Sequence, residues 1–191
     1  MVKSGSESLQ NDDARRAAEL IERIGRLVHG DLRQEGLHPA QGEALRYLAR
    51  ANRFSRTPAA LADFLGTTRG TVSQTVIALE RAGHVTRSVS TRDGRSTALD
   101  LTASGWALAE QGLAALARDI AAVGAAATLA SQLAAALLAA LAARGQRAFG
   151  ACRTCRHFGT IPDAPGAYHC SLLDEPLSAV DAEMICVEQA A

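Results

Sequence analysis

Residues 57–105, TPAALADFLGTTRGTVSQTVIALERAGHVTRSVSTRDGRSTALDLTASG, decide the fold of this chain. Thr57 followed by proline predicts the N-cap and the first residue of a short helix. Thr68 predicts the N-cap of a second helix, which runs to the glycine that closes ALERAG. Residues 84–90 and 96–101 alternate between apolar and polar side chains. They predict two strands joined by the Asp-Gly turn of TRDGR.

The second of these helices has two different faces. Val72, Val76 and Leu79 follow one another at helical spacing, so we expect them to face the core. The opposite side carries only hydrogen-bonding side chains and no carboxylate, namely Arg69, Thr71, Ser73 and Gln74. Such a face suits a phosphate-lined DNA groove, although an ordinary solvated face has the same composition.

The predicted hairpin tip is basic, with Arg92 and Arg95 on either side of the Asp-Gly turn. The whole chain has no net charge, but residues 68–96 carry a local balance of +3. A two-arginine tip can reach a minor groove or phosphates, and solvated tips also carry arginine. The order of helix, helix and basic hairpin is more specific than any one part.

Residues 37–108 resemble the winged helix-turn-helix of the MarR family. The resemblance is carried by LADFLGTTRGTVSQTVIALERAGHVTR and by the wing TRDGRSTALDLTASG. The family pattern D-x-R…L-x-L-T-x-x-G is present as Asp93, Arg95, Leu99, Leu101, Thr102 and Gly105. The resemblance implies a homodimeric transcriptional regulator, not an enzyme, whose recognition helix starts near Thr68. It also implies that Arg95 enters the minor groove and that Asp93 braces the wing.

Residues expected at the DNA are Thr57, Thr68, Arg69, Thr71, Ser73, Gln74, Arg92 and Arg95. In a two-fold dimer the two recognition helices would lie roughly 34 Å apart, in successive major grooves. We therefore expect the partner to be double-stranded DNA with a pseudo-palindromic operator.

The expected fold class is mainly α with a small β-hairpin wing, an α+β chain with a helical dimerisation region and a metal-stapled tail. Residues 1–12 are expected to be disordered and residues 13–36 to form an N-terminal dimerisation helix. The winged helix-turn-helix then occupies residues 37–105, and C-terminal dimerisation helices occupy residues 106–149. A cysteine-rich metal-binding tail completes the chain at residues 150–191.

Residues 125–143 form the most apolar stretch, which is mostly alanine. Leucine recurs there every four residues, at Leu129, Leu133, Leu137 and Leu141. This stripe favours packing on another helix over a membrane span. The polar N-terminus lacks the apolar core of a secretory signal, so we expect a cytoplasmic protein with no membrane partner.

All four cysteines lie in the tail, as C-x2-C-x14-C-x15-C, at Cys152, Cys155, Cys170 and Cys186. Clustered thiols in a cytoplasmic protein more often bind metal than form disulfides. One C-x2-C followed by two solitary cysteines with apolar neighbours favours an iron–sulfur cluster, [2Fe–2S] or [4Fe–4S], over a structural zinc ion. Zinc and a thiol switch remain alternatives, and His157 and His169 are expected outside the ligand set.

The sequence thus predicts a redox- or iron-sensing regulator, in which the cluster alters the packing of the preceding dimerisation helix and so modulates operator binding. The alternative is a MarR-type regulator with a structural zinc site that responds to a small ligand in a cleft. A dithiol enzyme using Cys152 and Cys155 lacks the strand–helix–strand pattern expected around such a pair.

Overall fold

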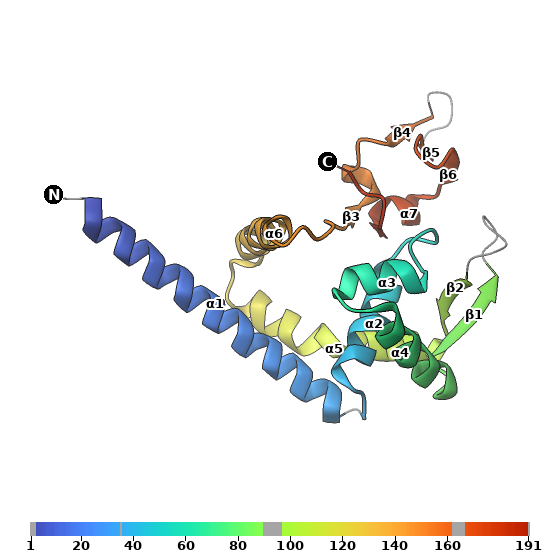
Figure 1. Ribbon diagram of the computed structural model, residues 1–191, viewed down its shortest axis with the longest axis horizontal. Coiled ribbons are helices and arrows are strands. Elements are labelled where there is room, and N and C mark those ends of the chain that lie inside the picture. The colour runs from blue at the N-terminus through green and yellow to red at the C-terminus, as the bar shows by residue number, and fades with distance from the viewer. Residues whose placement is uncertain (1–2, 35, 90–96, 162–166, 191) are drawn as a thin grey trace. The chain divides into compact units, whose positions relative to one another are not determined.

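The computed structural model describes residues 3–34, 36–89, 97–161 and 167–190 of the chain (Figure 1). The chain divides into two units, Met1–Pro39 and Ala40–Ala191. The first unit is dominated by one long helix, α1 (Lys3–Gln34). This helix starts ten residues before the predicted residue 13 and so includes residues 3–12 of the segment that was expected to be disordered. The segment is polar but contains no proline, so nothing prevents the helix from propagating through it.

The winged helix-turn-helix consists of α2 (Pro39–Arg50), α3 (Pro58–Leu65), α4 (Arg69–Arg81), β1 (Val85–Val89) and β2 (Thr97–Leu101). Thr57 and Thr68 are the N-caps of α3 and α4, as predicted, and each accepts a backbone N–H. Gly66 ends α3 with φ of 60°, a left-handed conformation that favours glycine. β1 and β2 pair as an antiparallel hairpin with Val85 opposite Leu101.

The core of this domain consists of aliphatic side chains from all of these elements. Val72, Val76 and Leu79 of α4 are fully buried, as their spacing predicts. The other fully buried members include Leu45, Leu48, Leu61 and Leu99. Each buried side chain contributes about 1.5–3 kcal/mol relative to exposure, so this core holds α4 at a fixed orientation.

The local structure explains why a threonine and a glycine occupy positions 102 and 105 of the wing pattern. Thr102 is the N-cap of α5 (Ala103–Ala122), where its hydroxyl accepts the Gly105 N–H at 3.2 Å and donates to the Gly83 carbonyl at 2.7 Å. A Cβ at Gly105 would lie 2.1 Å from the carbonyl oxygen of His84. A side chain at position 105 therefore requires the backbone at His84 to move.

We expect Gly105→Ala to lower the free energy of unfolding by about 1–3 kcal/mol, because the backbone at His84 must move away from the new methyl group. Chemical denaturation of the purified variant measures this loss. Gly25→Ala is the matched control, since its new Cβ would meet nothing within 4 Å and alanine favours the helix. Equal stability of Gly105→Ala and the wild type would contradict the assignment.

After α5, Gly124 (φ 77°) breaks the chain before α6 (Ala126–Ala143). All residues of α6 are described and none is buried. Leu129, Leu133 and Leu137 of the leucine stripe are exposed in the single chain, Leu137 to 59%, and Leu141 is half-buried. By length and composition α6 is also apolar enough to cross a membrane.

The tail forms short elements around its cysteines. They are β3 (Gly150–Ala151), the 3-10 helix η1 (Cys152–Thr154), β4 (Phe158–Thr160), β5 (Tyr168–Cys170), β6 (Glu175–Leu177), α7 (Ala179–Glu183) and β7 (Ile185–Cys186). β3 pairs with β7, and β4, β5 and β6 form a second antiparallel sheet. These pairings bring sequence-distant cysteines together, since Gly150 lies opposite Cys186 and Phe158 lies opposite Cys170.

Candidate nucleic-acid interface and cysteine centre

The outer face of α4 is available to a partner. Arg69, Thr71, Ser73 and Gln74 are all exposed, in agreement with their spacing. The Thr68 hydroxyl accepts the Thr71 N–H at 3.1 Å, so it fixes the first turn of the helix. Thr57 instead caps α3 by accepting the Ala60 N–H at 3.1 Å. The N-terminal turn of α4 therefore presents backbone N–H groups and side chains without negative charge, which suit an anionic backbone.

Ion pairs fix the strands of the wing. Arg87 of β1 pairs with Glu80 of α4 at 3.1 Å, and Asp100 of β2 pairs with Arg56 at 3.3 Å. The carboxylate of Glu80, near the C-terminal end of α4, is thereby paired with a cation. The predicted tip residues, Arg92, Asp93 and Arg95, lie outside the described residues.

The four cysteines line one small cavity, and the other residues of its wall are His157, Phe158, Leu172, Leu177 and Glu188. Cys152, Cys170 and Cys186 are buried, and Cys155 is half-buried. The C-x2-C segment turns back on itself because the Cys155 N–H donates to the Cys152 carbonyl at 2.9 Å. The rings of Phe158 and Tyr168, with centroids 4.9 Å apart and planes tilted by 34°, pack against this cluster.

Two N–H groups point at sulfur atoms of the cluster. Asn52 Nδ2 donates to Cys152 Sγ at 3.1 Å, and the Ala190 N–H donates to Cys155 Sγ at 3.4 Å. The hydrogen bond from Cys152 lowers the pKa of Cys186 to about 6, against the effect of burial. The same bond, together with burial, raises the pKa of Cys152. The cavity therefore favours a thiolate at Cys186, and thiolates are the form that binds metals.

Single-ion geometry is not present among these side chains. Within the described ranges, no three His, Cys, Asp or Glu side chains are placed to hold one metal ion together. The cavity encloses about 10 Å³, room for one water-sized group. His169 pairs with Asp174 at 3.1 Å, and the His157 Nε2 atom lies 3.4 Å from Arg156 Nε. The cavity is thus lined by four cysteine thiols, and two of their sulfur atoms accept N–H groups.

The tail docks on the loop that joins α2 to α3, residues 51–56, which we call the α2–α3 loop. Asn52 N–H donates to the Ile185 carbonyl at 2.9 Å, and the Val187 N–H donates to Ser55 Oγ at 2.9 Å. Both residues that flank Cys186 are therefore bonded to this loop. The sequence predicts only a connecting loop at residues 52–56. Its role was missed because its partners lie more than one hundred residues away.

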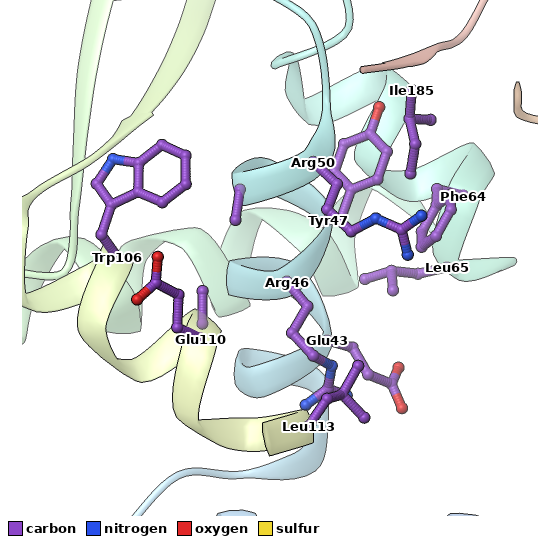
Figure 2. A pocket seen from close by; sticks show the side chains of 12 residues that line it. Glu43, Arg46, Tyr47, Arg50, Phe64, Leu65, Trp106, Glu110, Leu113 and Ile185 are labelled. Carbon is purple, nitrogen blue, oxygen red and sulfur yellow. The ribbon is translucent and has the colours of Figure 1, made fainter. Parts of the chain in front are cut away.

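A second, larger cavity lies between α2, α3 and α5 (Figure 2). Its volume is about 590 Å³, and Ile185 from the tail contributes to its wall. The aromatic lining comprises Tyr47, Phe64 and Trp106. Arg46 reaches this cavity, and its Nη1 atom is buried without a hydrogen-bond partner in the part of the chain that the structure describes. Burial lowers the pKa of Arg46, partly offset by Glu43.

This arrangement, a capped polar helix braced by a two-stranded wing, defines a winged-helix protein. Residues 35–96 match the sequence model of the MarR family. MepR from Staphylococcus aureus in its DNA-binding conformation shares the fold with a TM-score of 0.57 and 23% identity, over 68% of this chain and 96% of MepR. The S. aureus MepR–DNA complex matches at 0.52 and 23%, with the same coverage.

A cysteine-to-serine mutant of MarR from E. coli also shares the fold. It matches with a TM-score of 0.52 and 23% identity, over 65% of this chain and 95% of that one. No curated protein matches the chain in sequence. The chain therefore has the MarR-like winged-helix fold, and its four cysteines lie outside the segment that matches the family model.

Proposed function

We propose that this chain is a homodimeric transcriptional regulator whose affinity for operator DNA is set by a metal centre on its four tail cysteines. The observation that carries the DNA-binding part is the exposed, carboxylate-free outer face of α4 in a MarR-like fold. In this proposal Arg69, Thr71, Ser73 and Gln74 enter the major groove, with Thr57 and Thr68 near phosphates. The wing arginines, Arg92 and Arg95, reach the adjacent minor groove. A solved complex of MepR, which has the same fold, contains DNA.

The dimer is supported by unpartnered apolar faces on two helices. On α1 these side chains are Leu20, Ile21, Ile24 and Leu27, and on α6 they are Leu129, Leu133, Leu137 and Leu138, all exposed in the single chain. A soluble monomer rarely leaves such rows uncovered. A second copy would cover them and would supply the second recognition helix for a pseudo-palindromic site.

An iron–sulfur cluster is the centre we propose. Four thiols line one cavity, but no three donors among the described residues converge on a single point, and a polynuclear cluster takes its thiolates at separate irons. Such a cluster supplies a change of charge on oxidation or loss of iron. The protein holds it through Cys152, Cys155, Cys170 and Cys186. Asn52 and the Ala190 amide donate to sulfur, and Phe158 excludes water.

A second candidate is a structural zinc ion with a small-molecule effector. The small volume around the cysteines favours a single ion, since a cluster would require the walls to move outward. The 590 Å³ cavity has the size and apolar lining of a ligand site, and Arg46 Nη1, which has no hydrogen-bond partner among the described residues, is an anchor for an anionic group.

Purification without oxygen, followed by visible absorption and iron, sulfide and zinc analysis, separates these candidates. We expect a brown protein with stoichiometric iron and sulfide. A colourless protein with one zinc per chain would replace the cluster with the second candidate and leave the regulator intact. Selection of duplexes from a random library tests DNA binding, and absence of any preferred duplex would refute the regulator itself.

Gln74→Ala is expected to change which operator is preferred, by about 1–3 kcal/mol for each base pair that the side chain reads, because the exposed amide can bind a base edge. Binding to the selected operator and to single-base variants measures this change. Arg81→Ala is the control, since it removes an exposed charge from the other end of α4. Unaltered base preference in Gln74→Ala would show that the reading face is assigned wrongly.

A further inference from the structure

The α2–α3 loop connects the cysteine centre to the wing through two side chains. The first is Asn52, which is fully buried. Its Nδ2–H donates to Cys152 Sγ, while its Oδ1 is buried without a partner among the described residues. Burying an amide side chain with one end unsatisfied is costly. We therefore take the hydrogen bond to the Cys152 sulfur as the reason for an asparagine at this position.

The second side chain is Arg56, whose guanidinium contacts its own loop, β2 and the tail. Its Nε donates to the Ala51 carbonyl at 3.0 Å, and its Nη1 pairs with Asp100 Oδ1 at 3.3 Å on β2. Its Nη2 lies 3.9 Å from Met184 Sδ, two residues before Cys186. The Arg56 carbonyl also accepts the Leu99 N–H at 2.8 Å. One residue thus links the wing strand, the first residue of its own loop and the cysteine segment.

Backbone hydrogen bonds complete the connection. The Met184 carbonyl accepts the Cys152 N–H at 3.2 Å, so Met184 moves with two ligand positions. At the other end, the Ser55 carbonyl accepts the Thr57 N–H at 2.8 Å, and Thr57 is the N-cap of α3. Displacement of the cysteine segment is therefore transmitted to the start of the helix-turn-helix and to β2.

We infer that the winged helix reads the state of the cysteine centre directly, within one protomer, through Asn52 at a ligating thiolate and Arg56 at the wing. This inference rests on the proposed regulatory metal centre. It replaces the route expected from sequence order, through the dimerisation helix that precedes the tail. Loss of the metal frees the Cys152 and Cys186 segments, which releases Arg56 and with it the orientation of β2.

The test compares operator dissociation constants of the full-length protein with metal bound and after removal by a chelator. Allosteric couplings commonly span about 5- to 150-fold, and we expect a wild-type ratio in that range. In Arg56→Lys and Asp100→Ala the ratio should fall to within about twofold of one, with metal content unchanged. Arg56→Lys is the more decisive variant, because Asp100→Ala also removes the acceptor of the Ser88 hydroxyl within the wing hairpin.

Arg53→Ala is the matched control. Arg53 belongs to the same loop and pairs with Glu175 at 3.8 Å and Asp181 at 3.9 Å in the tail, so it should keep the wild-type ratio. A wild-type ratio of one would refute the regulatory metal centre and this inference together. A full ratio retained in both Arg56→Lys and Asp100→Ala would overturn the inference alone.

Asn52→Ala tests the contact at sulfur by a separate readout. Loss of the N–H donor should shift the visible absorption of the metal-bound thiolates and speed metal loss to a chelator at least severalfold. The melting temperature of the metal-free variant, compared with metal-free wild type, shows whether the change is merely structural. An unchanged spectrum and rate of metal loss would exclude Asn52 from the centre.

Discussion

Cys186→Ser is expected to abolish stoichiometric metal binding and to unfold the tail. Serine is not ionised at neutral pH, so it cannot replace the thiolate that the Cys152 hydrogen bond favours at this position. Structural metal sites contribute on the order of 10 kcal/mol to the folding of small domains, far more than the two- and three-residue strands of the tail can supply. Metal analysis and limited proteolysis of the tail measure both effects.

His169→Ala is the control for the cysteine change. His169 is adjacent to Cys170 in sequence, but it pairs with Asp174 at the surface, so its loss should leave the metal content unchanged. A Cys186→Ser protein that retains one centre per chain would contradict the four-cysteine assignment. Equal loss of metal in His169→Ala would add a histidine to the ligand set.

Leu137→Glu should convert the dimer to a monomer and weaken operator binding by about 10²- to 10⁴-fold, because two linked recognition helices bind far more tightly than one. The position is exposed in the single chain and belongs to the leucine stripe of α6. A carboxylate there would have to be buried, unpaired, in the proposed interface. Light scattering gives the mass, and fluorescence anisotropy gives the affinity.

Ala139→Glu provides the comparison on the same helix. Residue 139 is exposed and lies on the side of α6 opposite Leu137, so the variant should remain a dimer with wild-type affinity. If both variants stay dimeric, the interface does not use the leucine stripe. If the wild-type protein sediments with membranes, α6 would instead be a membrane-associated helix, as its length and apolar composition allow.

The winged helix could be predicted because its signals are local. Thr57 and Thr68 cap helices within three residues of themselves, and Gly66 ends one by adopting φ of 60°. The spacing of Val72, Val76 and Leu79 fixes which face of α4 is buried and hence which face is exposed. The predicted start of the first helix at residue 13 was less accurate, since α1 begins at Lys3.

The cysteine spacing indicated a thiolate site, and the pairing of β3 with β7 and of β4 with β5 brings its members to one cavity. No local sequence pattern predicted which residues contact the cysteine segment. Asn52 meets Cys152 across one hundred residues, and Arg56 joins Asp100 to Met184. Helix periods and caps are set by residues a few positions apart, so they can be predicted from the sequence. Contacts between a loop and a distant tail depend on how complete surfaces pack, which only the folded chain determines.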